Sequence, residues 1–464
     1  MDEIIYASAT EIARAIREKE VSSEEVINAH LARIEEVNPK INAVVQLTAD
    51  AARTRAREAD AALARGENWG ALHGVPVTIK DAFETAGIVS AGGTKGRAQF
   101  IPEEDAVGVA RYKSAGAVVL GKTNVPELSL AFESDNLVYG QTKNPYDPTR
   151  TPGGSSGGEA AGVASGMSPL GLGSDAGGSI RLPAHFCGIA GIKPTTGRTP
   201  RTGHFLPPGG LLDSVWQIGP LARRVEDLAL ALPILCGVDW RDPTVVPFPV
   251  GKHTDVDLKT LRVAFHTDNG VVAPTADIAS VVRDAARSLG DAGCEVVEAR
   301  PPVPANAYEM LRGLYAADGG AGLRMMLMLS GTGETSALMN RLLELLGSVT
   351  MTTSDLVMLV FQLDQWRSAM ISFMRDYDLI LCPPCARTAM PHGTTFDDEN
   401  QLFFSYTMLY NMTGWPGVVV RAGTSEEGLP VGAQLVARPW REDVALAAAL
   451  AVESALGGWQ RPPL

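Results

Sequence analysis

The stretch Gly153 to Pro183, "GGSSGGEAAGVASGMSPLGLGSDAGGSIRLP", decides how this chain is interpreted. It contains two Gly-Gly-Ser turns, one ending at Ser155 and one at Ser179, on either side of a short apolar strand. Glycine leaves the neighbouring backbone N–H groups unshielded, so such a turn can direct several donors at one point, as an oxyanion hole requires. Linkers and ordinary turns use the same residues. A flexible linker does not normally contain an apolar strand between two such turns, so the pair of turns indicates a catalytic site.

A serine nucleophile needs a base, and no histidine lies in an obvious partner context. His73, His185 and His204 each lack a clear carboxylate to orient them. Lys80 is the alternative, because it ends the apolar run "VPVTIK". Burial can lower a lysine pKa by about 3–5 units from its usual value near 10.4. The lowered pKa lies close enough to 7 for the amine to act as a base at neutral pH. A lysine at a strand end is also often exposed, so its burial is left open at this point.

The composition is that of a globular protein with an acidic surface. The chain has 464 residues, 45% of them hydrophobic, a net charge of −13 and a pI of about 5.1. An acidic surface repels phosphate backbones, so we expect no nucleic-acid partner. The N-terminus lacks the apolar core of a signal peptide, and the longest uncharged run, 401–420, contains Gly414 and Pro416. We therefore expect a cytoplasmic protein without a membrane partner.

Five scattered cysteines are too few for a disulfide framework or a four-cysteine zinc site. Cys382-Pro-Pro-Cys385 follows an apolar run and is typical of a strand end in the core. We expect no metal and no cofactor.

Apolar strands alternate with helices along most of the chain, which predicts the α/β class with a sheet covered on both faces. No linker or repeat interrupts the pattern, so residues 1–464 are expected to form a single large domain. The expected helices include two over 8–37, the second beginning at the capping box Ser22-x-x-Glu25, and others over 48–65, 104–115, 157–166, 275–290 and 442–456. The expected strands are 41–47, 74–83, 117–122, 169–174, 261–266, 294–299, 417–423 and 431–437.

Residues 301–375 differ from the rest, because they hold nine of the 14 methionines in helical-period runs. We expect a helical cap here. Its methionines either fill core helices or line an adaptable apolar substrate pocket. Met325 and Met328, together with Trp415 in "NMTGWPG", are the candidates for pocket residues.

The segment "GAVVLGKT", Gly116 to Thr123, matches the pattern of a phosphate-binding P-loop. The variable positions are Ala-Val-Val-Leu, which are the residues of a strand rather than of a flexible loop. Asn124-Val125-Pro126 follows in place of a helix start. We therefore interpret the match as accidental and do not expect nucleotide binding.

Together these segments resemble the amidase signature family. The stretch 153–183 is similar to its signature. Further segments that are similar to landmarks of the family are "IKD" at Lys80, "LGKTN-PE" at 120–127, "GPLARRVEDLAL" at 219–230 and "GLPVGAQLVA" at 428–437. The resemblance covers about residues 8–240 and 378–456, with 70–240 as the signature core and 301–375 as a variable insertion. It implies a central mixed β-sheet with helices on both faces.

The resemblance also implies a Ser-cisSer-Lys triad, with Ser179 as nucleophile, Ser155 as the bridging serine after a cis peptide bond and Lys80 as base. Ser156 is a rival for the bridge. The implied oxyanion hole consists of the N–H groups of Ala176, Gly177, Gly178 and Ser179, and Asp175 and Arg181 would brace the loop.

The function expected from this resemblance is hydrolysis of C–N bonds through an acyl-enzyme. The candidate substrates are apolar or aromatic amides, aryl amides among them, and in addition carbamates (urethanes) and esters. The alternative is the A subunit of a glutamine-dependent aminoacyl-tRNA amidotransferase, for which 301–375 shows no obvious charged clamp for glutamine. Whether the chain forms a homodimer is left open.

Overall fold

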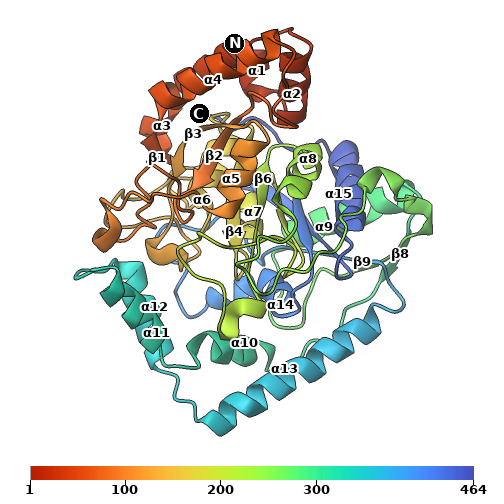
Figure 1. Ribbon diagram of the computed structural model, residues 1–464. Helices are drawn as coiled ribbons and strands as arrows, with labels where there is room; N and C mark the ends of the chain where they lie inside the picture. The colour runs from red at the N-terminus through yellow and green to blue at the C-terminus, as the bar shows by residue number, and fades with distance from the viewer. Residues whose placement is uncertain (1, 305) are drawn as a thin grey trace.

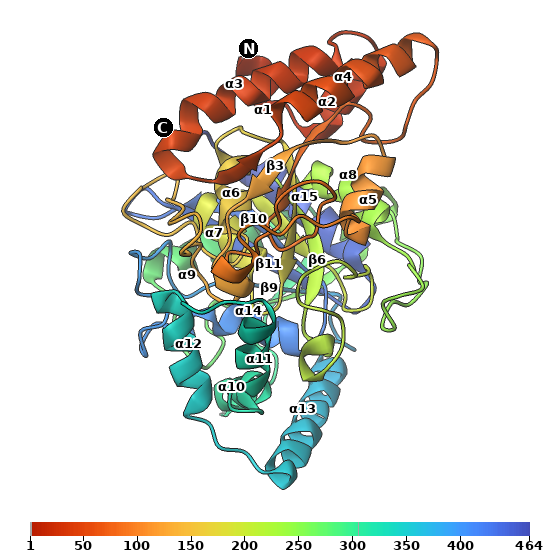
Figure 2. The same cartoon turned by 60° about the vertical axis from the view of Figure 1, so that its left-hand side comes forward.

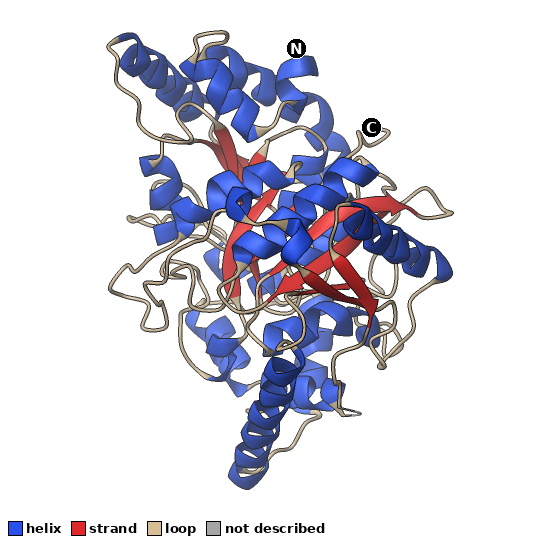
Figure 3. Cartoon of the chain, turned by 90° about the vertical axis from the view of Figure 1, so that its right-hand side faces the viewer, coloured by secondary structure: helices blue, strands red, loops and turns tan. Residues whose placement is uncertain are grey.

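One eleven-stranded mixed sheet runs through the computed structural model, which describes residues 2–304 and 306–464 (Figure 3). The strand order is β1-β3-β2-β4-β6-β5-β10-β11-β9-β7-β8. β2 is parallel to β3 and β4, and β7 is parallel to β8 and β9, whereas the remaining pairs are antiparallel. The α/β class and the mixed sheet expected from the sequence are thus confirmed.

The strands are β1 (Val44–Leu47), β2 (Pro76–Lys80), β3 (Val118–Thr123), β4 (Leu170–Asp175), β5 (Ala190–Lys193), β6 (Gln217–Ala222), β7 (Arg262–Phe265), β8 (Glu295–Glu298), β9 (Leu379–Cys382), β10 (Gly417–Thr424) and β11 (Pro430–Ala437). The helices are α1 (Asp2–Tyr6), α2 (Ala9–Arg17), α3 (Ser23–Ile41), α4 (Ala49–Ala64), α5 (Val107–Ser114), α6 (Gly157–Ala164), α7 (Arg181–Cys187), α8 (Val225–Leu235), α9 (Ala276–Asp291), α10 (Ala307–Ala316), α11 (Ala321–Leu329), α12 (Ala337–Gly347), α13 (Thr353–Phe373), α14 (Ser405–Met412) and α15 (Glu442–Leu456).

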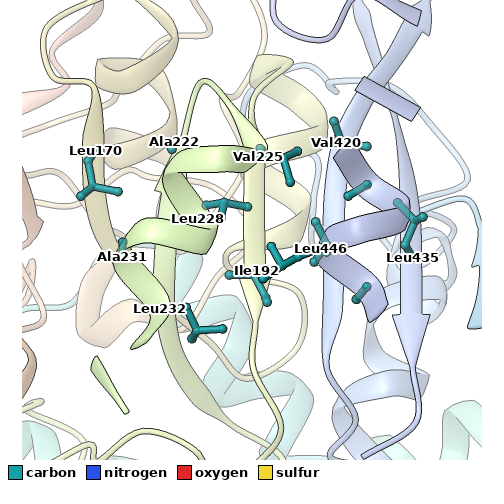
Figure 4. Packing of buried hydrophobic residues seen from close by; sticks show 14 of the residues in the cluster. Leu170, Ile192, Ala222, Val225, Leu228, Ala231, Leu232, Val420, Leu435 and Leu446 are labelled. Carbon is teal, nitrogen blue, oxygen red and sulfur yellow. The ribbon is translucent and has the colours of Figure 1, made fainter. Parts of the chain in front are cut away.

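Helices cover both faces of the sheet. Alternate side chains of β10 point to opposite faces, and each set packs against a different group of helices. Val418 and Val420 pack into one apolar cluster, with α8, α9 and α15, whereas Val419 between them packs into the opposite one, with α6 and α7. Figure 4 shows the first face, where Leu228 and Leu232 of α8 lie over Ile192 of β5. Strands buried on both sides are therefore apolar at nearly every position.

The elements expected from the sequence lie within a few residues of their predicted bounds. The capping box before α3 is present, with Ser22 and Glu25 each bonded to the other's backbone N–H. α15 spans the predicted residues 442–456. The segment resembling a P-loop is strand β3, as its apolar residues predict. Cys382 ends strand β9, and both Cys382 and Cys385 are buried free thiols.

The segment 301–375 is helical, as expected, and contributes α10 to α13. Figures 1 and 2 show these helices at the end of the molecule opposite α1 to α4. α10 packs against α13 and α14, and the interface buries Met310 and Met370. Met339 of α12 and Leu323 of α11 pack against Leu128 of the body in a separate cluster. We call α10 to α13 the cap. No helix in the described part of the chain is long and apolar enough to cross a membrane.

Candidate active site

Lys80 is the last residue of β2 and lies between β3 and β4 in the interior of the sheet. Its side chain is fully buried. The Nζ atom donates to Ser155 Oγ at 2.7 Å and to Ser174 Oγ at 2.9 Å, and it lies 3.4 Å from the carbonyl oxygen of Ser174. The lysine of the "IKD" segment is therefore buried rather than exposed, which settles the alternative that the sequence left open.

Burial lowers the pKa of Lys80 from 10.5 to about 7, because the ammonium form loses its hydration. The carboxylates of Asp175 and Glu159 oppose this shift, since a nearby negative charge favours the ammonium form. Near neutral pH the amine is thus present in comparable amounts with and without its proton. A group in this state can both accept and return a proton during one reaction cycle.

Ser155 is brought to Lys80 by the turn before α6. The peptide bond between Gly154 and Ser155 is cis. A Cβ atom at Gly154 would lie 2.5 Å from the backbone nitrogen of Glu133, so only glycine fits there. The hydroxyl of the rival Ser156 donates instead to the carbonyl oxygen of Ser174 at 3.3 Å. Of these two serines, Ser155 is the one that contacts the lysine.

Ser179 lies in the loop between β4 and α7, which we call the glycine loop (residues 175–179). Its carbonyl oxygen accepts a hydrogen bond of 3.1 Å from the backbone N–H of Ser156, so the two glycine–serine turns lie side by side. The Ser179 side chain lines a cavity on one side. The residues 155 and 179, far apart in the sequence, therefore lie in adjacent turns, and Ser155 is the one of the two that contacts Lys80.

Three of the four predicted oxyanion donors are free. Within the described part of the chain, the N–H groups of Ala176, Gly177 and Ser179 have no hydrogen-bond partner. Gly178 differs, because its N–H donates to Asp175 Oδ1 at 2.8 Å. The prediction that Gly178 belongs to the oxyanion hole is therefore corrected, since a carboxylate already occupies its donor.

Asp175 and Arg181, the residues expected to brace the loop, form an ion pair, and Asp175 also accepts from the backbone N–H of Gly178. Two nitrogens of Arg181 bind the two oxygens of Asp175, each at 2.9 Å, and both side chains are fully buried. Burial alone would raise the pKa of Asp175, but the Arg181 guanidinium holds it well below its usual range. Asp175 therefore stays ionised and keeps its bonds to the backbone of the loop.

Two more residues lie at the site: Ser174, which the sequence analysis did not identify, and His204, which it set aside as a catalytic base. Ser174 Oγ, which accepts from Lys80, lies 3.0 Å from His204 Nε2. His204 Nδ1 accepts from the N–H of Leu206 at 3.2 Å. Burial lowers the pKa of His204 well below its usual value, so the ring is neutral. A neutral ring that accepts at Nδ1 carries its hydrogen on Nε2, and His204 therefore donates to Ser174.

The other two histidines considered in the sequence analysis, His73 and His185, are bonded to the backbone of the protein interior. His73 Nε2 lies 3.1 Å from the carbonyl oxygen of Ala59, and His185 Nδ1 accepts from the backbone N–H of Gly432.

Lys122 of the segment resembling a P-loop is fully buried. It donates to the carbonyl oxygen of Phe83 at 2.6 Å and is therefore not available to a phosphate.

The cavity beside Ser179 has a volume of about 330 Å³ and lies between the glycine loop and the cap. Its wall is mainly apolar, with a few polar or charged groups, namely Ser129, Ser179, Tyr308, Arg312, Tyr315, Asp318 and Gln401. The apolar side chains of the wall are Leu130, Ala131, Phe132, Ala176, Leu206, Leu212, Leu323, Met326, Leu342, Leu345, Leu346, Phe396 and Met408.

The prediction that Met325, Met328 and Trp415 line the substrate pocket is wrong. Met325 and Met328 are 54% and 68% exposed, and Met326 lines the cavity in their place. α11 is apolar on nearly all sides, so its sequence did not indicate which face would turn inward. Trp415 is only 3% exposed and packs in the apolar cluster beneath the cap, away from the cavity wall.

Comparisons with known proteins find matches over nearly the whole chain. The family model described as Amidase matches residues 25–446. The A subunit of the glutamyl-tRNA(Gln) amidotransferase of Chloroflexus aurantiacus is 34% identical over 472 residues, which cover 95% of each protein. The acylamidase of Rhodococcus erythropolis is 33% identical over 464 residues, covering 97% of this chain and 95% of the relative.

Solved structures extend the similarity to three dimensions. The structure of 6-aminohexanoate cyclic dimer hydrolase complexed with substrate matches with a TM-score of 0.87, at 29% identity and with 99% of both chains covered. The match therefore includes the cap as well as the sheet.

Proposed function

This chain belongs to the amidase family, and from that premise we propose that it is a stand-alone hydrolase that cleaves amide bonds through an acyl-enzyme on Ser179. The observation that carries the proposal is the buried amine of Lys80, 2.7 Å from the Ser155 hydroxyl and next to a loop with unpaired N–H donors. A base of lowered pKa, a hydroxyl relay and an anion site are the parts that acyl transfer needs.

In the first half-reaction, Ser179 Oγ attacks the carbonyl carbon of the amide. Its proton passes to Ser155 Oγ while the proton of Ser155 passes to the neutral amine of Lys80. The carbonyl oxygen becomes negative and is stabilised by the N–H groups of Ala176, Gly177 and Ser179. The C–N bond then breaks, and the leaving nitrogen takes a proton back through Ser155, which restores neutral Lys80.

In the second half-reaction, water replaces the amine. Lys80, acting through Ser155, removes a proton from the water as its oxygen attacks the acyl carbon. The ester bond to Ser179 then breaks, and Ser179 regains its proton from the relay. The products are a carboxylic acid and an amine, and each group of the enzyme returns to its starting state.

The apolar wall of the cavity favours a substrate with an apolar or aromatic group beside the scissile bond. Leu323, Met326 and Leu346 from the cap provide much of that wall. We therefore propose aryl and alkyl amides as substrates, with aryl carbamates and esters as further members of the class, because all present a carbonyl to Ser179. The names of two similar proteins, an acylamidase and a 6-aminohexanoate cyclic dimer hydrolase, support this choice.

The test is a panel of p-nitroanilides, aryl carbamates and p-nitrophenyl esters with acyl groups of increasing length. We expect hydrolysis of the apolar members and a loss of roughly 10³-fold or more in kcat for Ser179→Ala. Activity that persists in Ser179→Ala would refute the assignment of the nucleophile.

The second candidate is the ammonia-releasing component of an amidotransferase, favoured by the 34% identity to such a protein. That function needs a subsite for the charged α-amino and α-carboxylate groups of glutamine. Arg312 and Asp318 are charged residues in the cavity wall, but the rest of the wall is mainly apolar. Ammonia release from glutamine, compared with hydrolysis of an apolar anilide by the same preparation, separates the two. Glutamine turnover exceeding that of every apolar amide would favour the amidotransferase.

A further inference from the structure

The three unpaired N–H groups of the glycine loop owe their direction to the carbonyl groups behind them. In a trans peptide unit the C=O and N–H bonds point in opposite directions, so fixing the carbonyl of one residue aims the N–H of the next. Each of the three donors can therefore be traced to the group that holds the preceding carbonyl.

Two of these carbonyls are held by the body of the protein. The carbonyl oxygen of Asp175, which precedes Ala176, lies 3.4 Å from Asn411 Nδ2 of α14. The carbonyl oxygen of Gly178, which precedes Ser179, accepts from the N–H of Leu182 at 2.6 Å. These contacts come from elements packed against the sheet and do not involve the cap.

The third carbonyl, that of Ala176, is held by the cap. It accepts a hydrogen bond from the hydroxyl of Tyr315 on α10, and Tyr315 also lines the cavity. Among the described residues, this is the only hydrogen bond from the cap to the glycine loop. The peptide that follows is held independently, because Thr407 Oγ1 donates to the carbonyl oxygen of Gly177 at 2.9 Å. Tyr315 therefore holds one specific peptide unit.

We propose that Tyr315 is a positioning residue, which aims the Gly177 N–H at the oxyanion by holding the carbonyl of Ala176. This inference rests on the proposed function and adds a role for the cap in transition-state stabilisation. The Tyr315 hydroxyl acts through the loop carbonyl to which it donates. Its effect appears only when negative charge develops on the substrate oxygen, because only then does the direction of the Gly177 N–H matter.

The surroundings of Tyr315 suit this role. Burial raises the pKa of Tyr315, so the hydroxyl keeps its hydrogen and remains a donor over the working pH range. Without that hydroxyl, the Ala176–Gly177 peptide would lose the one partner that its carbonyl has among the described residues, and the peptide could rotate. Glycine at 177 offers little resistance to such a rotation.

The experiment compares the parent with Tyr315→Phe and Tyr146→Phe. Tyr146 is a matched control, because its hydroxyl also donates to a backbone carbonyl, that of Gln460, but it does not line the cavity. For each protein we would measure kcat and KM on an anilide that the parent hydrolyses, inhibition by a trifluoromethyl ketone, and the rate at which a fluorophosphonate labels Ser179.

For Tyr315→Phe we expect kcat and the labelling rate to fall roughly 10- to 100-fold, less than the 10²–10³-fold cost of deleting an oxyanion donor. KM should stay within about twofold of the parent, and the inhibition constant of the ketone should rise in proportion to the loss in kcat. Tyr146→Phe should match the parent.

Parent-like kcat and ketone inhibition in Tyr315→Phe would overturn the inference while leaving the proposed function intact. A raised KM with unchanged kcat would also overturn it, because Tyr315 would then bind substrate directly. A parent protein that neither hydrolyses amides nor is labelled at Ser179 would refute the proposed function, and this inference with it.

Discussion

Amide hydrolysis by this protein should fall steeply below pH 7, because Lys80 must be neutral to accept the proton of Ser155. Burial lowers the pKa of Lys80 from 10.5 to about 7. For a base with that pKa, the neutral fraction is about a half at pH 7, about a tenth at pH 6 and about a hundredth at pH 5. We therefore expect kcat/KM to reach a plateau above pH 8 and to fall about tenfold per pH unit below 6.

The fall of kcat/KM at low pH is the acid limb of the pH profile. A substitution of Glu159 tests whether the titration of Lys80 causes this limb. The negative charge of Glu159 raises the pKa of Lys80, so Glu159→Gln should move the acid limb of the profile to lower pH. The shift should be modest, since burial raises the pKa of Glu159 itself to about 7 and the carboxyl is only partly ionised near the limb. A limb that disappears in Glu159→Gln would instead assign the titration to Glu159.

The assay is continuous release of p-nitroaniline between pH 5 and 9 at substrate concentrations far below KM, with Lys80→Met as the control that should be inactive throughout. A flat profile between pH 6 and 8 would refute the reasoning. So would a limb near pH 10, which is where an ordinary, solvated lysine titrates.

Three further substitutions probe other parts of the site. Ser174→Ala removes a hydroxyl that accepts from Lys80. Because such a hydrogen bond contributes about 0.5–1.5 kcal/mol, kcat should fall roughly 3- to 10-fold with little change in KM. A kcat equal to that of the parent would contradict this prediction. Met326→Lys puts a charge into the apolar cavity wall. It should raise KM for a long-chain anilide at least about tenfold while sparing an acetyl anilide, and an equal effect on both substrates would argue against the cavity as the acyl site. Arg181→Met leaves Asp175 buried without its partner. The free energy of unfolding, measured by urea denaturation, should fall by about 3–5 kcal/mol, and a loss below about 1 kcal/mol would contradict the prediction.

Much of the fold could be predicted because its signals are local. The apolar strands and the capping box before α3 depend on residues close together in the sequence, and the structure has them near the predicted bounds. Lys80 could be identified because it ends an apolar run, and a lysine there is either buried or at the sheet edge.

Other parts of the site depend on contacts between distant segments. Ser174 lies near the end of β4, which pairs in parallel with β2, so the strand order would have placed it near Lys80 had that order been known. His204 and Tyr315 lie in a loop and in the cap, where no spacing relates them to the glycine loop. The predicted pocket methionines failed for a further reason: α11 is apolar around most of its circumference, so its inward face is decided by packing against Leu128 and α12.

The most direct test of the account is to locate the covalent adduct of a fluorophosphonate by peptide mass spectrometry in the parent and in Lys80→Met. The account predicts a single adduct on Ser179 in the parent and a labelling rate at least about 10³-fold lower in the variant, because the serine then has no base. An adduct on Ser155 or Ser156, or labelling of Lys80→Met at the parental rate, would contradict it.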